Sequence, residues 1–347
     1  MKSKKVSLAD IAQTLGVSKT LVSMVLNGKG EENGISKKTQ ERVLSLAEQL
    51  NYKPNQFARG LRIGRSNTIG LVVSDISNPF YSKLARYVED AVSEAGYNLM
   101  ICSSDESEEK ELKLIEMLVN KQVDGIILSS TLDTTEHVEG LQNENFPLVL
   151  IDRIYEGIDT HSVVVDNKAG AFEAVEHIVQ NGHKKIAALI ISPSHISTQV
   201  DRLEGYKEAL KKHSIPINPY FQKVIQREDI YKNANQLLME WKNDHMMPTA
   251  MFVSNNQIAI GCLEAIRELG LSIPRDISIV SFDDIDIFRL YSPPITSVIQ
   301  PIKSIAKNAV EILLGELKIK DNVDQVEKIH KLLQTNIVIR NSVLKLA

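Results

Sequence analysis

The chain has 347 residues, of which 43% are hydrophobic and 24% are charged, so it is long enough for two or three packed domains. No segment approaches about 18 consecutive apolar residues, which argues against a membrane span. The N-terminus has lysines but no apolar segment or cleavage site of a secretory signal, so we expect a cytoplasmic protein. Cys102 and Cys262 lie in apolar runs, and we expect buried, reduced thiols rather than a disulfide or metal site.

The charge is distributed unevenly along the chain. Residues 1–65 contain twelve Lys and Arg but only five Asp and Glu, which gives them a charge of +7. Because the whole chain has a net charge of −4, the remaining residues carry −11. A basic head on an acidic body favours a head that meets a polyanion. Charge alone leaves open that the lysines cluster by chance on a solvated surface.

Residues 7–26 predict two short helices around a turn. Ser7 and Asp10 fit a capped helix start, and apolar residues recur at helical spacing as far as Leu15. Gly16 is suited to ending that helix, and Ser18 to capping a second helix that runs to about Leu26. The second helix pairs an apolar face with a small polar face, as a recognition helix in the DNA major groove does. A helical hairpin without a DNA role is the alternative.

A third helix is predicted from Lys37 to about Leu50, capped by Ser36. The short basic segment that follows has Pro54, which suits a first helical turn, and Gly60, which weakens a helix by about 1 kcal/mol relative to alanine. We expect a linker that becomes helical only against DNA.

From residue 68 onward, short apolar runs alternate with amphipathic segments, which predicts parallel sheets with helices on both faces. The number of runs fits two sheets better than one. The expected strands are 69–73, 98–101, 125–128, 148–151, 162–165, 185–191, 223–225, 250–253, 277–280 and 296–299, and the clearest helices are 81–95, 108–120, 169–180, 202–212 and 258–269.

Ligands of open parallel sheets bind beyond the carboxyl ends of the strands. The residues there are rich in Asp, Asn and Arg with a few aromatics, a set that suits polyhydroxylated or other small polar ligands. Taken singly, each Asp is better explained as a turn or cap residue. The set comprises Asp75, Asn78, Phe80, Tyr81, Asp105, Ser129, Asp152, Arg153, Ser192, Asp229, Asn255, Asn256, Asp283 and Asp284.

Several motifs together resemble the LacI/GalR family of bacterial transcription regulators. In the head these are residues 7–28, with Val-Ser-x-Val-Leu-Asn in the second helix, and the Tyr-x-Pro-Asn-x-x-Ala-Arg-x-Leu pattern that begins at Tyr52. In the body they include Asn-Pro-Phe-Tyr at residues 78–81, Gly-His-Lys-Lys-Ile at 182–186 and Val-Ser-Phe-Asp-Asp at 280–284. The resemblance covers nearly the whole chain.

The resemblance implies an all-α helix-turn-helix headpiece followed by a two-lobed α/β core with doubly wound parallel sheets, like periplasmic sugar-binding proteins. The headpiece would span 1–53 and a hinge helix with its linker 54–66. The N-terminal lobe would comprise 67–166 with about 300–327, and the C-terminal lobe 167–299 with about 328–347.

The resemblance also implies roles for single residues in DNA binding. Met24 stands where an arginine often reads guanine, so we expect an apolar contact there, such as a thymine methyl. Glu31 and Glu32 lie in a long loop, 28–34, that could avoid the phosphates. Base contacts are implied for Lys19, Thr20, Met24 and Leu61, the last as a minor-groove wedge, and phosphate contacts for Ser18, Ser23, Asn27, Ser36, Tyr52, Asn55 and Arg59.

The effector would lie between the lobes. Ile230 replaces a common Phe or Trp at the stacking position, and Asn256 replaces a frequent Asp, so the resemblance does not identify the ligand among sugars, sugar acids, sugar phosphates and nucleosides. The implied effector-binding residues are Phe80, Tyr81, Asp152, Arg202, Ile230, Asn255, Asp283 and Gln300.

We therefore predict a repressor that binds a near-palindromic operator as a homodimer under effector control, without a cofactor, a metal or enzymatic activity. Only a short segment follows Arg340, without a heptad helix, so we expect a dimer rather than a tetramer. The alternatives are a sugar-binding protein without a regulatory role, and a Rossmann-type enzyme, whose phosphate-binding and nucleophile motifs are absent from the sequence. His183 and Trp241 are expected to brace the fold rather than bind a ligand.

Overall fold

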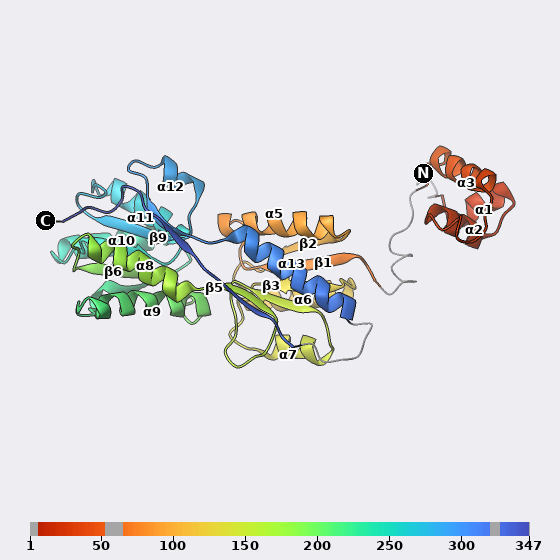
Figure 1. The fold of residues 1–347 in the computed structure, drawn as a ribbon. Helices are drawn as coiled ribbons and strands as arrows, with labels where there is room; N and C mark the ends of the chain where they lie inside the picture. Colours follow the sequence, from red (N-terminus) through yellow and green to blue (C-terminus); the bar gives the residue numbers. More distant parts are fainter. Residues whose placement is uncertain (1–5, 53–64, 320–326, 347) are drawn as a thin grey trace. The chain divides into compact units, whose positions relative to one another are not determined.

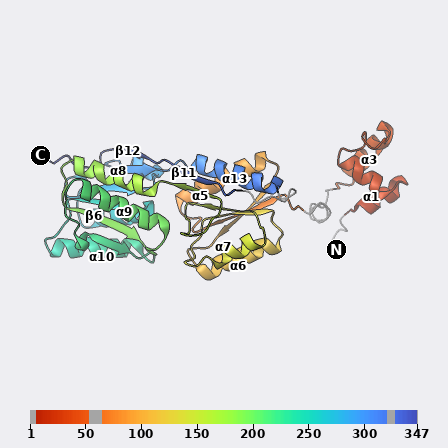
Figure 2. The ribbon, with the colours of Figure 1, turned by 60° about the horizontal axis from the view of Figure 1, so that its bottom comes forward.

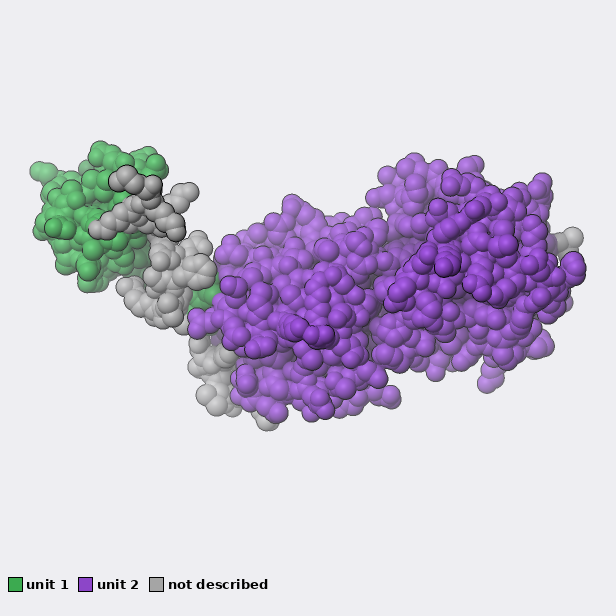
Figure 3. All heavy atoms as spheres, turned by 180° about the vertical axis from the view of Figure 1, so that it is seen from behind, with its two compact units in different colours: residues 1–66 green, residues 67–347 purple. Residues whose placement is uncertain are grey.

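The computed structural model describes residues 6–52, 65–319 and 327–346 (Figure 1). The chain divides into two compact units, Met1–Ser66 and Asn67–Ala347 (Figure 3). No helix in the described ranges is long and apolar enough to cross a membrane.

The first unit holds three helices within its described residues: α1 (Leu8–Leu15), α2 (Lys19–Leu26) and α3 (Lys37–Gln49). Each begins at a serine whose hydroxyl accepts a backbone N–H, and α1 has the full reciprocal capping box between Ser7 and Asp10. Gly16 ends α1 with φ +65°, a left-handed conformation that glycine adopts without strain. Ile11, Val22 and Val43, one from each helix, are fully buried at the centre of the unit.

The second unit is built on two six-stranded sheets within its described residues (Figures 1 and 2). The N-terminal lobe has the order β11-β5-β4-β3-β1-β2, with every pairing parallel. The C-terminal lobe has the order β12-β10-β9-β8-β6-β7, in which only β12 runs antiparallel to its neighbour. The strands are β1 (Thr68–Val73), β2 (Asn98–Ser103), β3 (Gly125–Leu128), β4 (Leu148–Ile151), β5 (Ser162–Val165), β6 (Ile186–Ile191), β7 (Gln222–Ile225), β8 (Ala250–Val253), β9 (Ser278–Phe282), β10 (Thr296–Ile299), β11 (His330–Leu333) and β12 (Asn336–Val338).

Helices cover both faces of each sheet, as the buried clusters show. In the N-terminal lobe, α5 (Pro79–Glu94) and α13 (Ile302–Ile319) pack on one face, and α6 (Glu108–Asn120) and α7 (Glu136–Asn143) on the other. In the C-terminal lobe, α8 (Asn167–Gln180) and α9 (Ser197–Lys212) cover one face, and α10 (Ile230–Asn243) and α11 (Asn256–Glu268) the other. A short α12 (Asp286–Leu290) and a 3-10 turn, η1 (Pro219–Phe221), complete the lobe.

The chain crosses between the lobes three times, and the third crossing corrects one predicted boundary. The crossings follow β5, β10 and β11. We expected residues from about 328 to belong to the C-terminal lobe, but β11 pairs with β5 in the N-terminal sheet, and only β12 joins the C-terminal sheet. The predicted boundary was wrong because β11 and β12 are short and β11 is mostly exposed. Their own apolar pattern therefore does not reveal the sheet to which each belongs.

Candidate functional site

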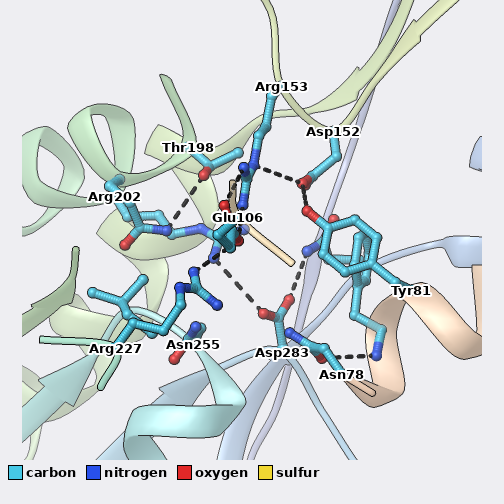
Figure 4. Close-up of a pocket in the computed structure, with 14 residues that line it drawn as sticks. Asn78, Tyr81, Glu106, Asp152, Arg153, Thr198, Arg202, Arg227, Asn255 and Asp283 are labelled. Atoms are coloured by element: carbon cyan, nitrogen blue, oxygen red, sulfur yellow. Dashed lines mark hydrogen bonds and ion pairs between the residues drawn. The ribbon is translucent and has the colours of Figure 1, made fainter. Parts of the chain in front are cut away.

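A cavity lies at the carboxyl ends of the strands, where loops of the two lobes of the second unit meet (Figure 4). It encloses about 350 Å³ of space free of protein atoms, part of it open to solvent. Its lining is largely polar: Asn78, Phe80, Tyr81, Glu106, Asp152, Arg153, Ile191, Thr198, Gln199, Arg202, Arg227, Asn255, Asp283 and Gln300.

Two aspartates follow central strands and are held in an uncommon backbone conformation. Asp152, after β4, has φ +63°, and Asp283, after β9, has φ +67°. Left-handed φ values are uncommon for residues other than glycine, and such strain collects at binding sites. This conformation turns the chain sharply at the end of each strand. The carboxylates of both aspartates are buried and line the cavity.

The N-terminal lobe fixes Asp152 through an aromatic hydroxyl. Asn78 caps α5 by accepting the N–H of Phe80, which sets Phe80 and Tyr81 at the buried start of the helix. The Tyr81 hydroxyl donates to Asp152 Oδ2 at 2.7 Å and lies 3.1 Å from Ser129 Oγ. Burial raises the pKa of Tyr81 above its usual range, so this hydroxyl keeps its proton and remains a donor.

Arg202 is a buried cation of the C-terminal lobe, held on several sides. Its Nε donates to Asn167 at 2.9 Å, its Nη1 donates to the carbonyl of Ser254 at 2.6 Å, and its guanidinium stacks 3.7 Å from the Phe282 ring centroid. Nη1 also lies 3.7 Å from Asp283 Oδ2, and Gln300 donates to Asp283 Oδ1 at 2.6 Å. Burial raises the pKa of Asp283, and the charge of Arg202 opposes that rise.

Glu106 joins the two lobes through a pair of arginines. Arg153, from its own lobe, donates to both carboxylate oxygens at 2.7 and 2.9 Å, and Arg227, from the C-terminal lobe, lies 2.8 Å from Oε1. Burial alone would raise the pKa of Glu106, but the hydrogen bonds and charge of Arg153 and the charge of Arg227 outweigh it and lower that pKa. Glu106 is therefore a fully ionised, bidentate partner inside the cleft.

Further hydrogen bonds cross the cleft around the cavity. Asn256 donates to Asn78 Oδ1 at 2.9 Å, and Gln257 donates to Asp75 Oδ2 at 3.0 Å. The backbone N–H of Ile154 donates to Ser197 Oγ at 3.2 Å. The lobes thus meet through polar contacts, which can be exchanged for ligand or water without exposing an apolar interface.

Seven of the eight predicted effector residues line this cavity, and Ile230 does not. The side chain of Ile230 packs instead against the C-terminal core at the start of α10, so the structure does not bring it together with the other seven. A Cβ placed on Gly261 of α11 would lie 2.8 Å from Ile230 Cγ2, so the absent side chain at Gly261 makes room for it.

Sequence reasoning missed part of the lining. Among the acidic residues after β2 it selected Asp105, whereas Glu106 faces the cleft and Asp105 is exposed, in a salt bridge with Lys110. Arg227 was also missed, although it follows β7 and the strand-end rule covers its position. Thr198 and Gln199 were missed because they lie in the first turn of α9 and not directly after a strand.

The headpiece presents the residues predicted to contact DNA mainly at its surface. Lys19, Thr20 and Asn27 are exposed, and Ser23 and Met24 are partly exposed. The predicted phosphate ligands Ser18 and Ser36 are exposed N-cap residues of α2 and α3, and Tyr52 is partly buried against the headpiece core. Asn55, Arg59 and Leu61 lie outside the described residues.

The residues predicted to brace the fold do so. His183 is buried between the Thr249 hydroxyl and the carbonyl of Leu344, each at 2.9 Å, and Trp241 is fully buried against Phe221. Cys102 and Cys262 are buried free thiols. Within the described ranges, no group of three or more His, Cys, Asp or Glu side chains could hold a metal ion.

Comparison with known proteins assigns both units. Residues 7–55 match the model of bacterial regulatory proteins of the lacI family, and residues 175–343 match a periplasmic binding protein-like domain. The chain is 33% identical to catabolite control protein A of Priestia megaterium over 319 residues, covering 92% of this chain and 94% of that protein.

Two further comparisons extend over nearly the whole chain. It is 33% identical over 343 residues to the transcriptional repressor PurR of Haemophilus influenzae strain PittEE, covering 97% of this chain and 98% of that one. Its structure resembles that of the lac repressor dimer bound to operator and an anti-inducer, with a TM-score of 0.85 and 27% identity over 98% of this chain and 100% of that one. The chain therefore belongs to the lacI family of bacterial regulatory proteins.

Proposed function

We propose that this regulator represses transcription by binding a near-palindromic operator as a dimer, and that a small polyhydroxylated effector in the cleft sets its affinity for DNA. Repression is the activity named for PurR and for the lac repressor, and the latter forms a dimer on its operator. The proposed site of action is the bacterial cytoplasm, where the operator lies. We propose no catalytic activity.

The cleft is the observation that carries the proposal. Its polar groups come from both lobes, so a ligand bound to Asp152 on one side and to Arg202 or Asp283 on the other stabilises one relative position of the lobes. An effector shifts a conformational equilibrium only by its differential affinity for the two states. Contacts from both lobes provide that difference.

The chemistry of the cleft favours a ligand with several hydroxyl groups. Carboxylates, amides and guanidiniums share bidentate hydrogen bonds with neighbouring hydroxyls, and the rings of Phe80 and Tyr81, which pack edge to face 4.9 Å apart, offer an apolar wall. A monosaccharide or its derivative combines those features. Because Ile230 lies elsewhere, an aromatic stacking partner from α10 is not part of the proposal.

In the proposed mechanism, two copies of α2 lie in successive major grooves, one helical turn apart. Effector binding changes the angle between the lobes, and that change reaches the hinge residues 54–62 and so the two headpieces. Leu61 is proposed as the minor-groove wedge. Replacing it by alanine should weaken operator binding and leave effector binding intact, whereas unchanged operator affinity would remove the wedge from the mechanism.

The decisive experiment is a thermal-shift screen of the full chain against sugars, sugar acids, sugar phosphates and nucleosides, followed by operator binding with and without each hit. A ligand at about 100 times its dissociation constant stabilises the folded protein by roughly 2.7 kcal/mol. A hit that changes operator affinity supports the proposal, and the sign separates inducer from corepressor.

The same screen tests the alternatives. Hits that never alter DNA affinity, together with no operator binding, would favour a sugar-binding protein without a regulatory role. Chemical conversion of a hit during incubation would establish an enzymatic activity.

A further inference from the structure

The charges that line the cavity balance one another. Three guanidiniums face three carboxylates, and each guanidinium has a carboxylate within 4 Å: Arg153 with Glu106 at 2.7 Å, Arg227 with Glu106 at 2.8 Å and Arg202 with Asp283 at 3.7 Å. The cavity is therefore rich in charge but has no net charge to offer a ligand.

Glu106 makes the contacts that an anionic ligand group would make. A ligand carboxylate or phosphate in an arginine-containing site is normally held by bidentate N–H donors. Here the Glu106 carboxylate takes both Nη groups of Arg153 and one Nη of Arg227, and only 6% of its side chain is exposed. An incoming anion would have to displace this carboxylate and leave it buried without its partners.

The donors and acceptors that remain are suited to hydroxyl groups. Within the described residues, the buried Nε atoms of Arg153 and Arg227 are donors without a hydrogen-bond partner, and the buried Oε1 of Gln300 is an acceptor without one. A hydroxyl both donates and accepts, so a polyol can satisfy atoms of both kinds. A phosphate dianion or a carboxylate group only accepts, so that group itself cannot pair with the Gln300 oxygen.

We infer that Glu106 is a specificity-determining residue that occupies the anion position of the cleft, so that the effector is an uncharged polyol and anionic sugars are rejected. The inference rests on the proposed function, because it concerns the same cleft. Arg227 holds Glu106 from the opposite lobe, so exclusion is strongest when the lobes are together.

The test is calorimetric titration of the full-length protein without DNA, using inorganic phosphate, D-ribose 5-phosphate and D-gluconate at constant ionic strength. The wild type is expected to show no saturable binding of these anions in the cleft. Glu106→Gln keeps the shape and removes the charge that pairs with two guanidiniums, so it should bind at least one of the anions saturably, about tenfold or more above the detection limit that the wild type does not reach. Saturable binding by the wild type, or no binding by a folded Glu106→Gln, would overturn the inference.

Asp105→Asn is the matched control, because it removes an adjacent carboxylate that pairs with Lys110 at the surface and does not line the cavity. It should behave like the wild type, and any phosphate bound by the headpiece is common to all three proteins. An equal gain in Asp105→Asn would mean that net charge rather than Glu106 controls anion binding, which would also overturn the inference.

If Glu106→Gln does not fold, the inference is tested by comparing anion binding in the wild type and in Arg227→Gln. Saturable binding of an anion by the wild type that disappears in Arg227→Gln would show that the cleft accepts anions and would refute exclusion; absence of such binding supports it. Operator binding measured on the same preparations tests the proposed function separately. A protein that binds its operator and responds to an anionic effector would refute the present inference but leave the proposed function intact.

Discussion

The two units of the molecule present the side chains that we propose for DNA and effector binding in opposite ways. In the headpiece, Lys19, Thr20 and Asn27 are exposed on a short helix whose other face supplies the buried Val22 and Val25. In the core, Arg202, Asp283 and most of their neighbours in the cavity are buried and paired with other protein groups.

The difference follows from the partners that each surface meets. DNA is a large polyanion read from outside, so the side chains that read it can stay solvated and add little to folding. A small effector has to be enclosed to be recognised, so its site consists of buried charges that fold stably only when paired. We therefore expect mutations on the surface of the headpiece to change DNA binding without changing stability, and mutations in the buried cleft to change both effector binding and stability.

The largest effect is expected for Arg202→Ala in the core. It leaves Asp283 without its cation and removes the stacking on Phe282, and breaking such a buried pair costs about 3–5 kcal/mol. Thermal unfolding of the core and the effector response should both suffer, while the headpiece keeps its helicity. Lys211→Ala, exposed on the same helix, should change neither property. A normal effector response in Arg202→Ala would refute the pocket assignment.

A smaller effect is expected for Ile11→Ala in the headpiece. Ile11 is fully buried where the three helices meet, and such truncations cost about 2–5 kcal/mol, a large share of the stability of a domain this small. Operator binding should be lost, whereas the unfolding temperature of the core should not change. Gln13→Ala, exposed on the same helix, provides the control. A lower unfolding temperature of the core would contradict the independence of the two units.

Met24→Ala should weaken operator binding without destabilising the headpiece. A contact to a base edge contributes about 1–3 kcal/mol, so affinity should fall roughly tenfold to a hundredfold and discrimination should relax at one base pair. Operator titrations with single-base variants measure this. Leu44→Ala removes an apolar side chain that is 50% exposed on α3 and should leave operator affinity unchanged. Equal losses in both variants would remove Met24 from the reading face.

The smallest expected effect is that of Ser7→Ala, which removes the hydroxyl of the capping box at the start of α1. Loss of an N-cap hydroxyl costs about 1 kcal/mol, so the unfolding midpoint of the headpiece should fall slightly in denaturant titrations. Ser45→Ala, on the exposed face of α3, should have no comparable effect. Equal stability of Ser7→Ala and the wild type would mean that the cap is replaced by water.

The predicted residues line the cavity where their position directly after a strand is enough to place them there. Asp152, Asn255 and Asp283 directly follow central strands, and the carboxyl ends of parallel strands meet at one edge whatever the rest of the fold does. The choice between Asp105 and Glu106 could not be made in that way. Both have left-handed φ, +52° and +57°, and the turn that they form directs only the second side chain into the cleft.

By itself, the sequence determined the three capped helices, ten of the strands, the alternation that makes two α/β lobes and the family to which the chain belongs, because caps and apolar periodicity act over a few residues. The tertiary structure alone decided that β11 and β12 lie in different sheets, that Ile230 fills the space at Gly261, and that one carboxylate binds arginines from both lobes. Each of those depends on segments far apart in the chain, so no local pattern encodes it.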